Sequence, residues 1–246
     1  MGSAIAESAK SRKGEYDMRE LIGNIEENGL KDKWSAITHF IGMLMTMLAA
    51  VPLLMRAANA PDKIHLVSLG IFVISMILLY GASTTYHSVR ASEKIQTVLR
   101  KIDHMMIFVL IAGSYTPICL VVLSGRIGYV MLALVWGIAL AGIVIKLYWI
   151  TCPKWFSSAL YIAMGWVCLM AFSKIYMALE GPAFYWLLAG GLIYTVGGII
   201  YALKVPGFDA RHKSFGSHEI FHLFVMGGSI CHFIVMFQYV SAMPIA

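Results

Sequence analysis

The stretch Ser217-His218-Glu219-Ile220-Phe221-His222 leads into an almost wholly apolar run from Leu223 to Val240. Two histidines four residues apart on a helix lie on one face, one turn apart, so a single metal ion can reach both. The apolar run is long enough to cross a bilayer. The two imidazoles would therefore lie at the mouth of a membrane-spanning helix, where ionisable groups are costly and mark functional sites.

The composition places the whole chain in a membrane. Of its 246 residues, 59% are hydrophobic and only 13% are charged, whereas soluble domains average about 45–50% apolar and about 25% charged residues. The net charge of +6 is expected from loops that set the topology, so nucleic acid is not an expected partner. The four cysteines contain no CxxC pair, which argues against a disulfide framework and a thiolate zinc site.

The apolar residues gather into seven long segments separated by short polar, glycine- or proline-containing loops. The sequence therefore predicts an all-α integral membrane protein, a seven-transmembrane-helix bundle. An N-terminal segment (1–33) is expected to be partly disordered or amphipathic, and a polar stretch before Asp103 to form a short interfacial helix. Pro117 is expected to kink the third span. The spans are expected at residues 34–54, 64–86, 103–123, 127–150, 155–179, 183–203 and 217–240.

The positive charges predict the orientation of the bundle. The N-terminal segment and the even-numbered loops together hold 15 Lys and Arg residues, and the opposite side holds 4 of the total of 19. Cytoplasmic segments are rich in Lys and Arg, so the N-terminus is expected in the cytoplasm and the C-terminus outside, in the cell inner (plasma) membrane. The N-terminal residues lack the short apolar core of a signal peptide.

This topology collects metal-binding residue types in the cytoplasmic half of the membrane. His39 begins the first span, His87 ends the second, Asp103 begins the third, and His218 and His222 begin the seventh. A catalytic zinc site typically has three protein ligands and one water. His87, His218 and His222 are therefore the expected metal ligands.

Two further residues are expected to support this zinc site. Asp103 is predicted to hydrogen-bond a ligand imidazole or a water at the metal. Ser83 lies one turn before His87 on the same helix face, so it is a candidate for the same role. A water activated by zinc at this depth would meet lipid ester or amide carbonyls.

The remaining histidines and Glu219 have other interpretations. His65, His104 and His212 are expected to be interfacial residues, and His232 to make an interhelical hydrogen bond. His218-Glu219-Ile220-Phe221-His222 also matches the HExxH pattern, in which the glutamate is the general base of a metalloprotease. The downstream glycine and third histidine of the extended form of that pattern are absent, so an intramembrane protease is the weaker hypothesis.

Five motifs of the chain together resemble one known family. They are Ser83-Thr-Thr-Tyr-His87, Lys101-Ile-Asp103-His104, Ala112-Gly-Ser-Tyr-Thr-Pro117, Ala163-Met-Gly-Trp166, and His218-x-x-x-His222 followed by Gly227-Gly-Ser-Ile-Cys-His232. In these motifs the sequence is similar to bacterial hemolysin III proteins, which belong to the progestin and adipoQ receptor superfamily. The first motif of that family, roughly E-x-x-N-x-x-x-H, appears here in altered form as Asp32-x-x-Ser35-x-x-x-His39.

The resemblance implies a seven-helix bundle with zinc near the cytoplasmic face, held by three histidines with support from Asp103 and Ser83. The wider kinship of the family with ceramidases suggests a zinc-dependent lipid amide or ester hydrolase. Two alternatives stay open, a non-enzymatic sensor or regulator of membrane lipids with structural zinc, and the cytolysis that the family name implies. Membrane lipid is the expected partner, and assembly into a homo-oligomer is left open.

Overall fold

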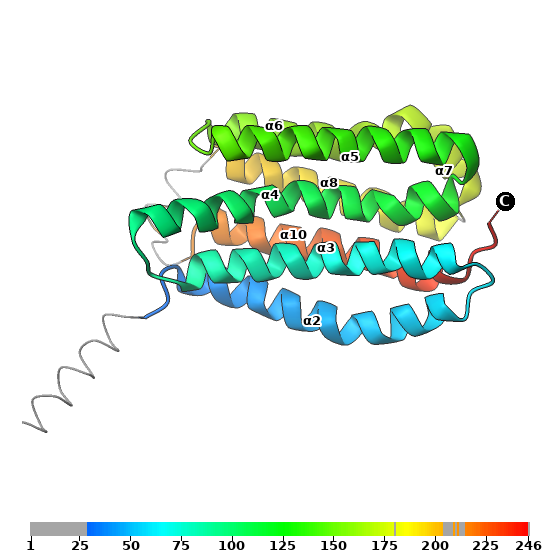
Figure 1. Cartoon of the computed structure of the whole chain (residues 1–246), viewed down its shortest axis with the longest axis horizontal. Coiled ribbons are helices and arrows are strands. Elements are labelled where there is room, and N and C mark those ends of the chain that lie inside the picture. The colour runs from blue at the N-terminus through cyan, green and yellow to red at the C-terminus, as the bar shows by residue number, and fades with distance from the viewer. Residues whose placement is uncertain (1–28, 180, 204–208, 210, 212–214, 246) are drawn as a thin grey trace, which may run out of the picture.

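The computed structural model describes residues 29–179, 181–203, 209, 211 and 215–245, and in these ranges it contains helices joined by short connections (Figure 1). Seven helical segments are long and apolar enough to cross a membrane. This confirms the predicted all-α fold with seven spanning helices. Most of the N-terminal segment predicted for residues 1–33 lies outside the described residues.

The spans are built from the following elements. The first three are α2 (Lys33–Ala58), α3 (Lys63–Ser88), and α4 (Glu93–Pro117) continued by the π-helix η1 (Ile118–Val122). The fourth is α5 (Gly125–Tyr148), and the fifth is α6 (Lys154–Gly165), the 3₁₀ segment η2 (Trp166–Ala171) and α7 (Phe172–Ala178). The last two are α8 (Gly181–Leu203) and α10 (Ser217–Gln238), which is followed by η3 (Val240–Ala242).

The third span differs from its prediction at its start. The polar stretch before Asp103 is not a separate interfacial helix, because α4 runs without a break from Glu93. No proline or glycine interrupts residues 93–103, and Glu93 lies in the first helical turn, where an acidic side chain is favoured. Asp103 therefore lies well inside a helix. At the far end α4 gives way to a π-helix directly after Pro117, where the sequence predicted a kink.

The fifth span is interrupted by a side chain from the third. The Tyr115 hydroxyl donates to the Gly165 carbonyl oxygen at 2.6 Å and accepts from the Cys168 backbone N–H at 2.8 Å. A side chain inserted between backbone donors and acceptors is a common cause of a helix break. The insertion explains why α6 gives way to the 3₁₀ segment η2 at Trp166 although no proline is present there.

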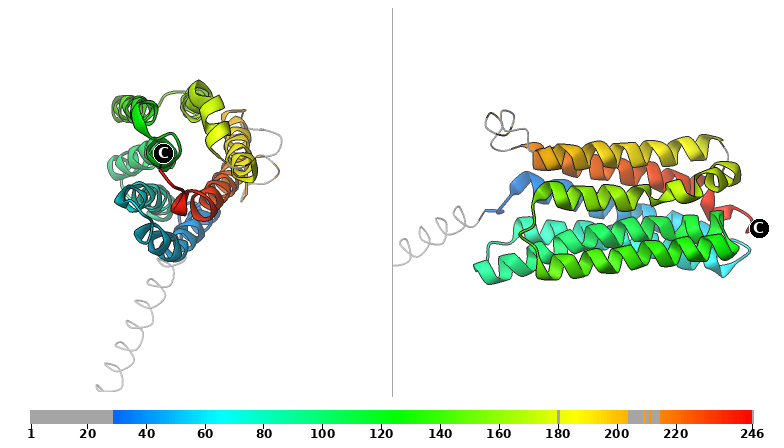
Figure 2. Two further views of the ribbon diagram at one scale, coloured as in Figure 1. Left: turned by 90° about the vertical axis from the view of Figure 1, so that its right-hand side faces the viewer. Right: turned by 90° about the horizontal axis from the view of Figure 1, so that it is seen from above.

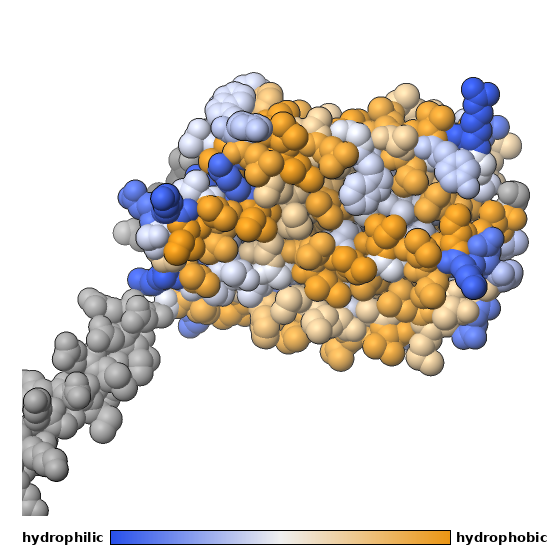
Figure 3. Space-filling model, viewed as in Figure 1, coloured by the Kyte–Doolittle hydropathy of each residue, from blue (hydrophilic) through white to orange (hydrophobic). Residues whose placement is uncertain are grey.

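The helices stand side by side around a common centre, as the end-on view shows (Figure 2). Helix α3 packs between α2 and α4, α10 packs on α8 and α2, and α6 packs mainly on α8. On the face shown in Figure 3, apolar side chains cover the middle and polar ones gather at the two ends. This arrangement suits a bundle whose outer surface contacts lipid.

Lys146 is one of the 15 charges that the sequence assigns to the N-terminal segment and the even-numbered loops, but it lies in the last turn of α5. Its side chain is 1% exposed. Its Nζ donates to Ser157 Oγ at 2.5 Å and to Cys152 Sγ at 3.1 Å. This ammonium group therefore joins the ends of two spans and does not face the membrane surface.

Candidate metal centre

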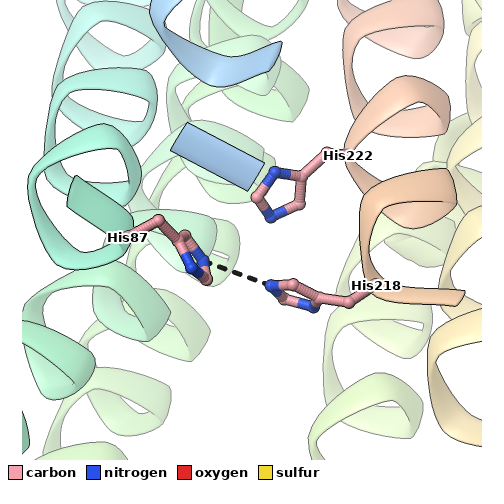
Figure 4. A group of neighbouring side chains, drawn as sticks. All are labelled: His87, His218 and His222. Carbon is pink, nitrogen blue, oxygen red and sulfur yellow. Dashed lines mark hydrogen bonds between the residues drawn. The ribbon is translucent and has the colours of Figure 1, made fainter. Parts of the chain in front are cut away.

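Three of the predicted site residues meet at one end of the bundle. His87 in the last turn of α3 and His218 and His222 in the first turns of α10 each offer one nitrogen, and these three atoms all lie within 4.8 Å of one another (Figure 4). His87 and His222 are 3% and 2% exposed. Among the described residues, these three histidines are the one group of at least three His, Cys, Asp or Glu side chains whose ligand atoms lie this close together.

The spacing of two of these nitrogens matches that of ligands in a zinc site. A tetrahedral site with Zn–N bonds of about 2.0–2.1 Å sets its nitrogens about 3.3 Å apart. The Nε2 atoms of His87 and His218 are 3.2 Å apart. Two imidazole nitrogens aimed at each other at this distance would suit a shared cation. The role of these residues as metal ligands stays a prediction.

The second nitrogen of His87 has a carboxylate partner. Nδ1 of His87 lies 2.9 Å from Oδ2 of Asp32, the residue that precedes α2. Because a carboxylate only accepts, Nδ1 carries the hydrogen and Nε2 keeps its lone pair. A carboxylate on the non-ligating nitrogen is the usual companion of a metal-bound histidine.

His222 is held in the same sense by α2. Its Nδ1 lies 3.3 Å from the Ser35 carbonyl oxygen and 3.4 Å from the Thr38 hydroxyl. The carbonyl assigns the hydrogen to Nδ1, which leaves Nε2 for a metal. The His39 ring stacks on the His222 ring with 3.6 Å between centroids and 5° between planes. His39, which was placed at this depth by the sequence, thus packs against a candidate ligand.

Glu219 has a structural role beside this site. Its Oε1 accepts a hydrogen bond from Ser35 Oγ at 2.6 Å, and its Oε2 accepts from the Gly216 backbone N–H at 2.8 Å. Both oxygens are therefore engaged in holding the start of α10 against α2. A general base must be free to reach the proton that it removes, so this geometry argues against the protease interpretation of the HExxH pattern.

Asp103 and Ser83 line the same cavity as His218 and His222. Asp103 is 8% exposed, and Oδ2 lies 3.7 Å from His104 Nδ1. No hydrogen bond joins Asp103 to the three histidines in the described part of the chain, so the imidazole partner is Asp32. The Ser83 hydroxyl is close enough to the Asp103 carboxylate to interact with it. The buried Ser83 hydroxyl nevertheless makes no hydrogen bond of standard geometry to the described residues.

A cavity of about 180 Å³ connects these groups to the interior of the bundle. Its lining includes His218 and His222, and also Asp103 and Ser83. From there it extends between the helices past apolar side chains to His232. The candidate metal centre therefore lies at one end of a largely apolar cavity.

The sequence predictions for the four remaining histidines have different outcomes. His65, expected to be interfacial, is 1% exposed and binds the Met243 carbonyl oxygen through Nε2 at 2.8 Å. His104, also expected at the interface, lines the cavity, with Tyr201 Oη 3.4 Å from its Nε2. His232 lies 3.3 Å from the Leu187 carbonyl oxygen, which confirms the predicted interhelical hydrogen bond. His212 lies outside the described residues.

The comparisons with known proteins agree with this architecture. The model of the family described as "Haemolysin-III related" matches residues 29–233. The chain belongs to the haemolysin-III-related family. It is 40% identical over 210 residues to "Hemolysin-3 homolog" of Bacillus subtilis (strain 168), covering 85% of this chain and 94% of that protein. It is 36% identical over 206 residues to "Hemolysin-3" of Bacillus cereus, covering 84% and 90%.

More distant similarity extends to animal receptors. The chain is 22% identical over 231 residues to "Adiponectin receptor protein" of Drosophila melanogaster, covering 80% of this chain and 48% of that protein. This relation fits the superfamily that the motifs indicated. The chain is thus a multi-pass membrane protein of the haemolysin-III-related family.

The roles of Asp32 and Ser35 in this family member were not predicted from the sequence. Both residues stand where the motif of the family has Glu and Asn, so the pattern left their roles open. In the structure Asp32 binds a candidate ligand, and Ser35 binds both His222 and Glu219. Asp32 could have been selected as a carboxylate just before the first span. Its partner His87 is 55 positions away in the sequence, so their contact can be seen only in the folded chain.

Proposed function

We propose that this protein is a zinc-dependent hydrolase of lipid amides or esters, with its site facing the cytoplasm. The observation that carries the proposal is the arrangement of His87 and His222, whose Nδ1 atoms are engaged by Asp32 and Ser35 and whose Nε2 atoms remain available beside Nε2 of His218. Zinc bound by three histidines with one open position activates water and polarises a carbonyl group.

The chain's own residues would perform the remaining tasks. The apolar part of the cavity holds the lipid chain and excludes bulk water, and Asp32 fixes the orientation of the His87 ring. Asp103 accepts the proton of the attacking water at a carboxylate oxygen and returns it to the leaving amine or alcohol as the carbonyl–nitrogen or carbonyl–oxygen bond breaks. The Ser83 hydroxyl, which lines the same cavity, would help to stabilise the developing oxyanion.

Turnover of ceramide-like amides by the purified protein tests this function. His218→Ala should lower the rate by about a hundredfold or more, because one of three ligands is lost. Gly137→Ala in α5 is a suitable control, since an added Cβ there meets nothing within 4 Å. Absence of turnover in the wild type, or equal turnover in His218→Ala, would refute the hydrolase.

The alternative is a lipid sensor with structural zinc. The contacts that favour it are those between Asp32 and His87 and between Ser35 and Glu219. They make the site a junction of α2, α3 and α10. In that case removal of zinc by a chelator should lower the melting temperature, while the intact protein shows no hydrolysis to lose.

Cytolysis is suggested for this chain by the names of its family and of its Bacillus relatives. Seven spanning helices suit permanent residence in the producing membrane. Release of a fluorophore from liposomes by the purified protein would establish cytolysis, and intact liposomes would exclude it under those conditions.

A further inference from the structure

The stretch Gly227-Gly-Ser-Ile-Cys-His232 on α10 has no role in the candidate metal centre. It meets α3 and α8 in the interior of the bundle. Ser229 Oγ accepts a hydrogen bond from the Tyr80 hydroxyl at 2.7 Å and shares another with the Tyr194 hydroxyl at 2.8 Å. The Tyr194 ring meets the His232 ring edge to face, with 5.3 Å between centroids. We call Tyr194, Ser229 and His232 the inner polar cluster.

Two glycines make room for the inner polar cluster. A Cβ added to Gly190 on α8 would lie 2.3 Å from Cδ2 of His232. A Cβ added to Gly228 on α10 would lie 2.8 Å from the Tyr194 ring. Each helix thus carries a glycine opposite the ring of the other. Because a glycine inside a helix is unfavourable relative to alanine, this reciprocal pattern indicates that both rings require the space.

The contacts of His232 assign its hydrogen. Nε2 lies 3.3 Å from the Leu187 carbonyl oxygen, and a carbonyl only accepts, so Nε2 carries the hydrogen in the neutral ring. Nδ1 is then an acceptor. It is buried and has no hydrogen-bond partner among the described residues. A buried acceptor without a donor is unfavourable, and an ionisable side chain at this depth is a candidate for function.

The cavity joins the inner polar cluster to the metal centre. Its lining includes His222 at one end and both Tyr194 and His232 further in. His232 follows His222 by ten residues on one helix, which is a rise of about 15 Å. Apolar side chains such as Val225 and Ile111 line the space as well. A lipid chain that extends inward from the metal centre would therefore pass the His232 ring, whose unpaired Nδ1 lies just behind the cavity wall with less than 1 Å² of accessible surface, so that a small turn of the ring would present it to the chain.

We propose that the inner polar cluster is a second subsite, which takes a hydroxyl group carried on the lipid chain. The hydroxyl donates its hydrogen to Nδ1 of His232. The proposal rests on the proposed function, because that function places the carbonyl end of the lipid at the metal centre. It adds the substrate class, namely lipids with a hydroxylated acyl or long-chain-base portion. A plain alkyl chain leaves Nδ1 unpaired, so it should bind more weakly.

Competition binding on the purified protein tests this subsite without requiring turnover. Radiolabelled palmitic acid is displaced by palmitic acid or by a series of palmitic acids hydroxylated at successive positions along the chain. The wild type should bind one group of mid- or distal-chain hydroxy acids about tenfold more tightly than palmitic acid. His232→Phe keeps a ring but removes the acceptor, so this preference should disappear. His232→Asn returns an oxygen acceptor near the Nδ1 position and should restore part of it.

The outcomes separate this proposal from the hydrolase. A preference that persists in the His218→Ala variant and vanishes in His232→Phe supports the subsite even if no hydrolysis is found. Equal affinity of the wild type for plain and hydroxylated chains overturns the subsite. This is the result expected if a water molecule already donates a hydrogen bond to Nδ1. A preference of the same size in His232→Phe also overturns it, because another residue then reads the hydroxyl. The series on the wild-type protein remains decisive should a variant fail to fold.

Discussion

His222 and His232 lie on the same helix, and the surrounding chain engages opposite nitrogens of their rings. Both face a backbone carbonyl, that of Ser35 for His222 and that of Leu187 for His232. In His222 the carbonyl engages Nδ1, and the free Nε2 faces two other histidines. In His232 the carbonyl engages Nε2, and Nδ1 is without a partner among the described residues.

The difference shows how the fold assigns separate tasks to identical side chains. A carbonyl or carboxylate fixes which nitrogen carries the hydrogen and thereby which nitrogen can accept. Where several free nitrogens converge, the arrangement suits a metal. Where a single one lies beside a cavity, it suits a hydrogen-bond donor. The two regions should therefore respond differently to substitutions of the residues around them.

The largest difference is expected from the carboxylate behind His87. Asp32→Asn removes the charge that orients this ring, so metal affinity should fall by about 10–100-fold. Asp62→Asn is the matched control, because Asp62 accepts a hydrogen bond from the Ile64 backbone N–H at the start of α3. Titration calorimetry with zinc on both variants measures the effect. Equal affinities would show that Asp32 does not support a metal ligand.

A smaller effect is expected from the packing of the inner polar cluster. Gly190→Ala places a Cβ 2.3 Å from the His232 ring, and such overpacking typically destabilises by about 1–3 kcal/mol. The neighbouring Gly191→Ala meets nothing within 4 Å and should be neutral or stabilise by up to about 1 kcal/mol. Thermal unfolding of the two variants in detergent provides the comparison. A Gly190→Ala protein as stable as Gly191→Ala would contradict the described fit of His232.

The smallest effect is expected at Glu219. Glu219→Gln keeps an acceptor for Ser35 but removes the charge, so the free energy of unfolding should fall by about 1 kcal/mol. Zinc binding and turnover should remain, because both oxygens of Glu219 are engaged by Ser35 and Gly216. Unfolding curves and turnover measured on one preparation test both statements. Loss of turnover with stability unchanged would instead support the metalloprotease interpretation of this residue.

Local signals in the sequence predicted the membrane fold and the pair His218 and His222, and the predicted topology added His87 to that pair. Apolar runs of spanning length mark the helices, and the spacing of His218 and His222 places them on one helix face. The role of Asp32 was not predicted because its partner, His87, is far away in the sequence. The break of the fifth span at Trp166 was not predicted because its cause, the Tyr115 hydroxyl, belongs to another helix.

The contacts of His65 and His104 could not be predicted for a related reason. Both lie near the predicted span starts, which is why an interfacial position was expected, but α4 begins at Glu93 and His104 lies inside that helix. The sequence gives no sign of the carbonyl or hydroxyl that meets these side chains in the fold. The free acceptor of His232 is likewise visible only once Leu187 is seen opposite Nε2. Each of these side-chain environments is set by a contact with a residue that is distant in the sequence, and a single sequence does not reveal such contacts.

The metal content of the purified protein tests the central claim most directly. Elemental analysis should find about one zinc ion per chain in the wild type, little or none in His87→Ala, and the wild-type amount in His232→Phe. That pattern would place the metal at the three-histidine group and leave the inner polar cluster to another ligand. Equal metal in the wild type and His87→Ala would contradict the proposed site.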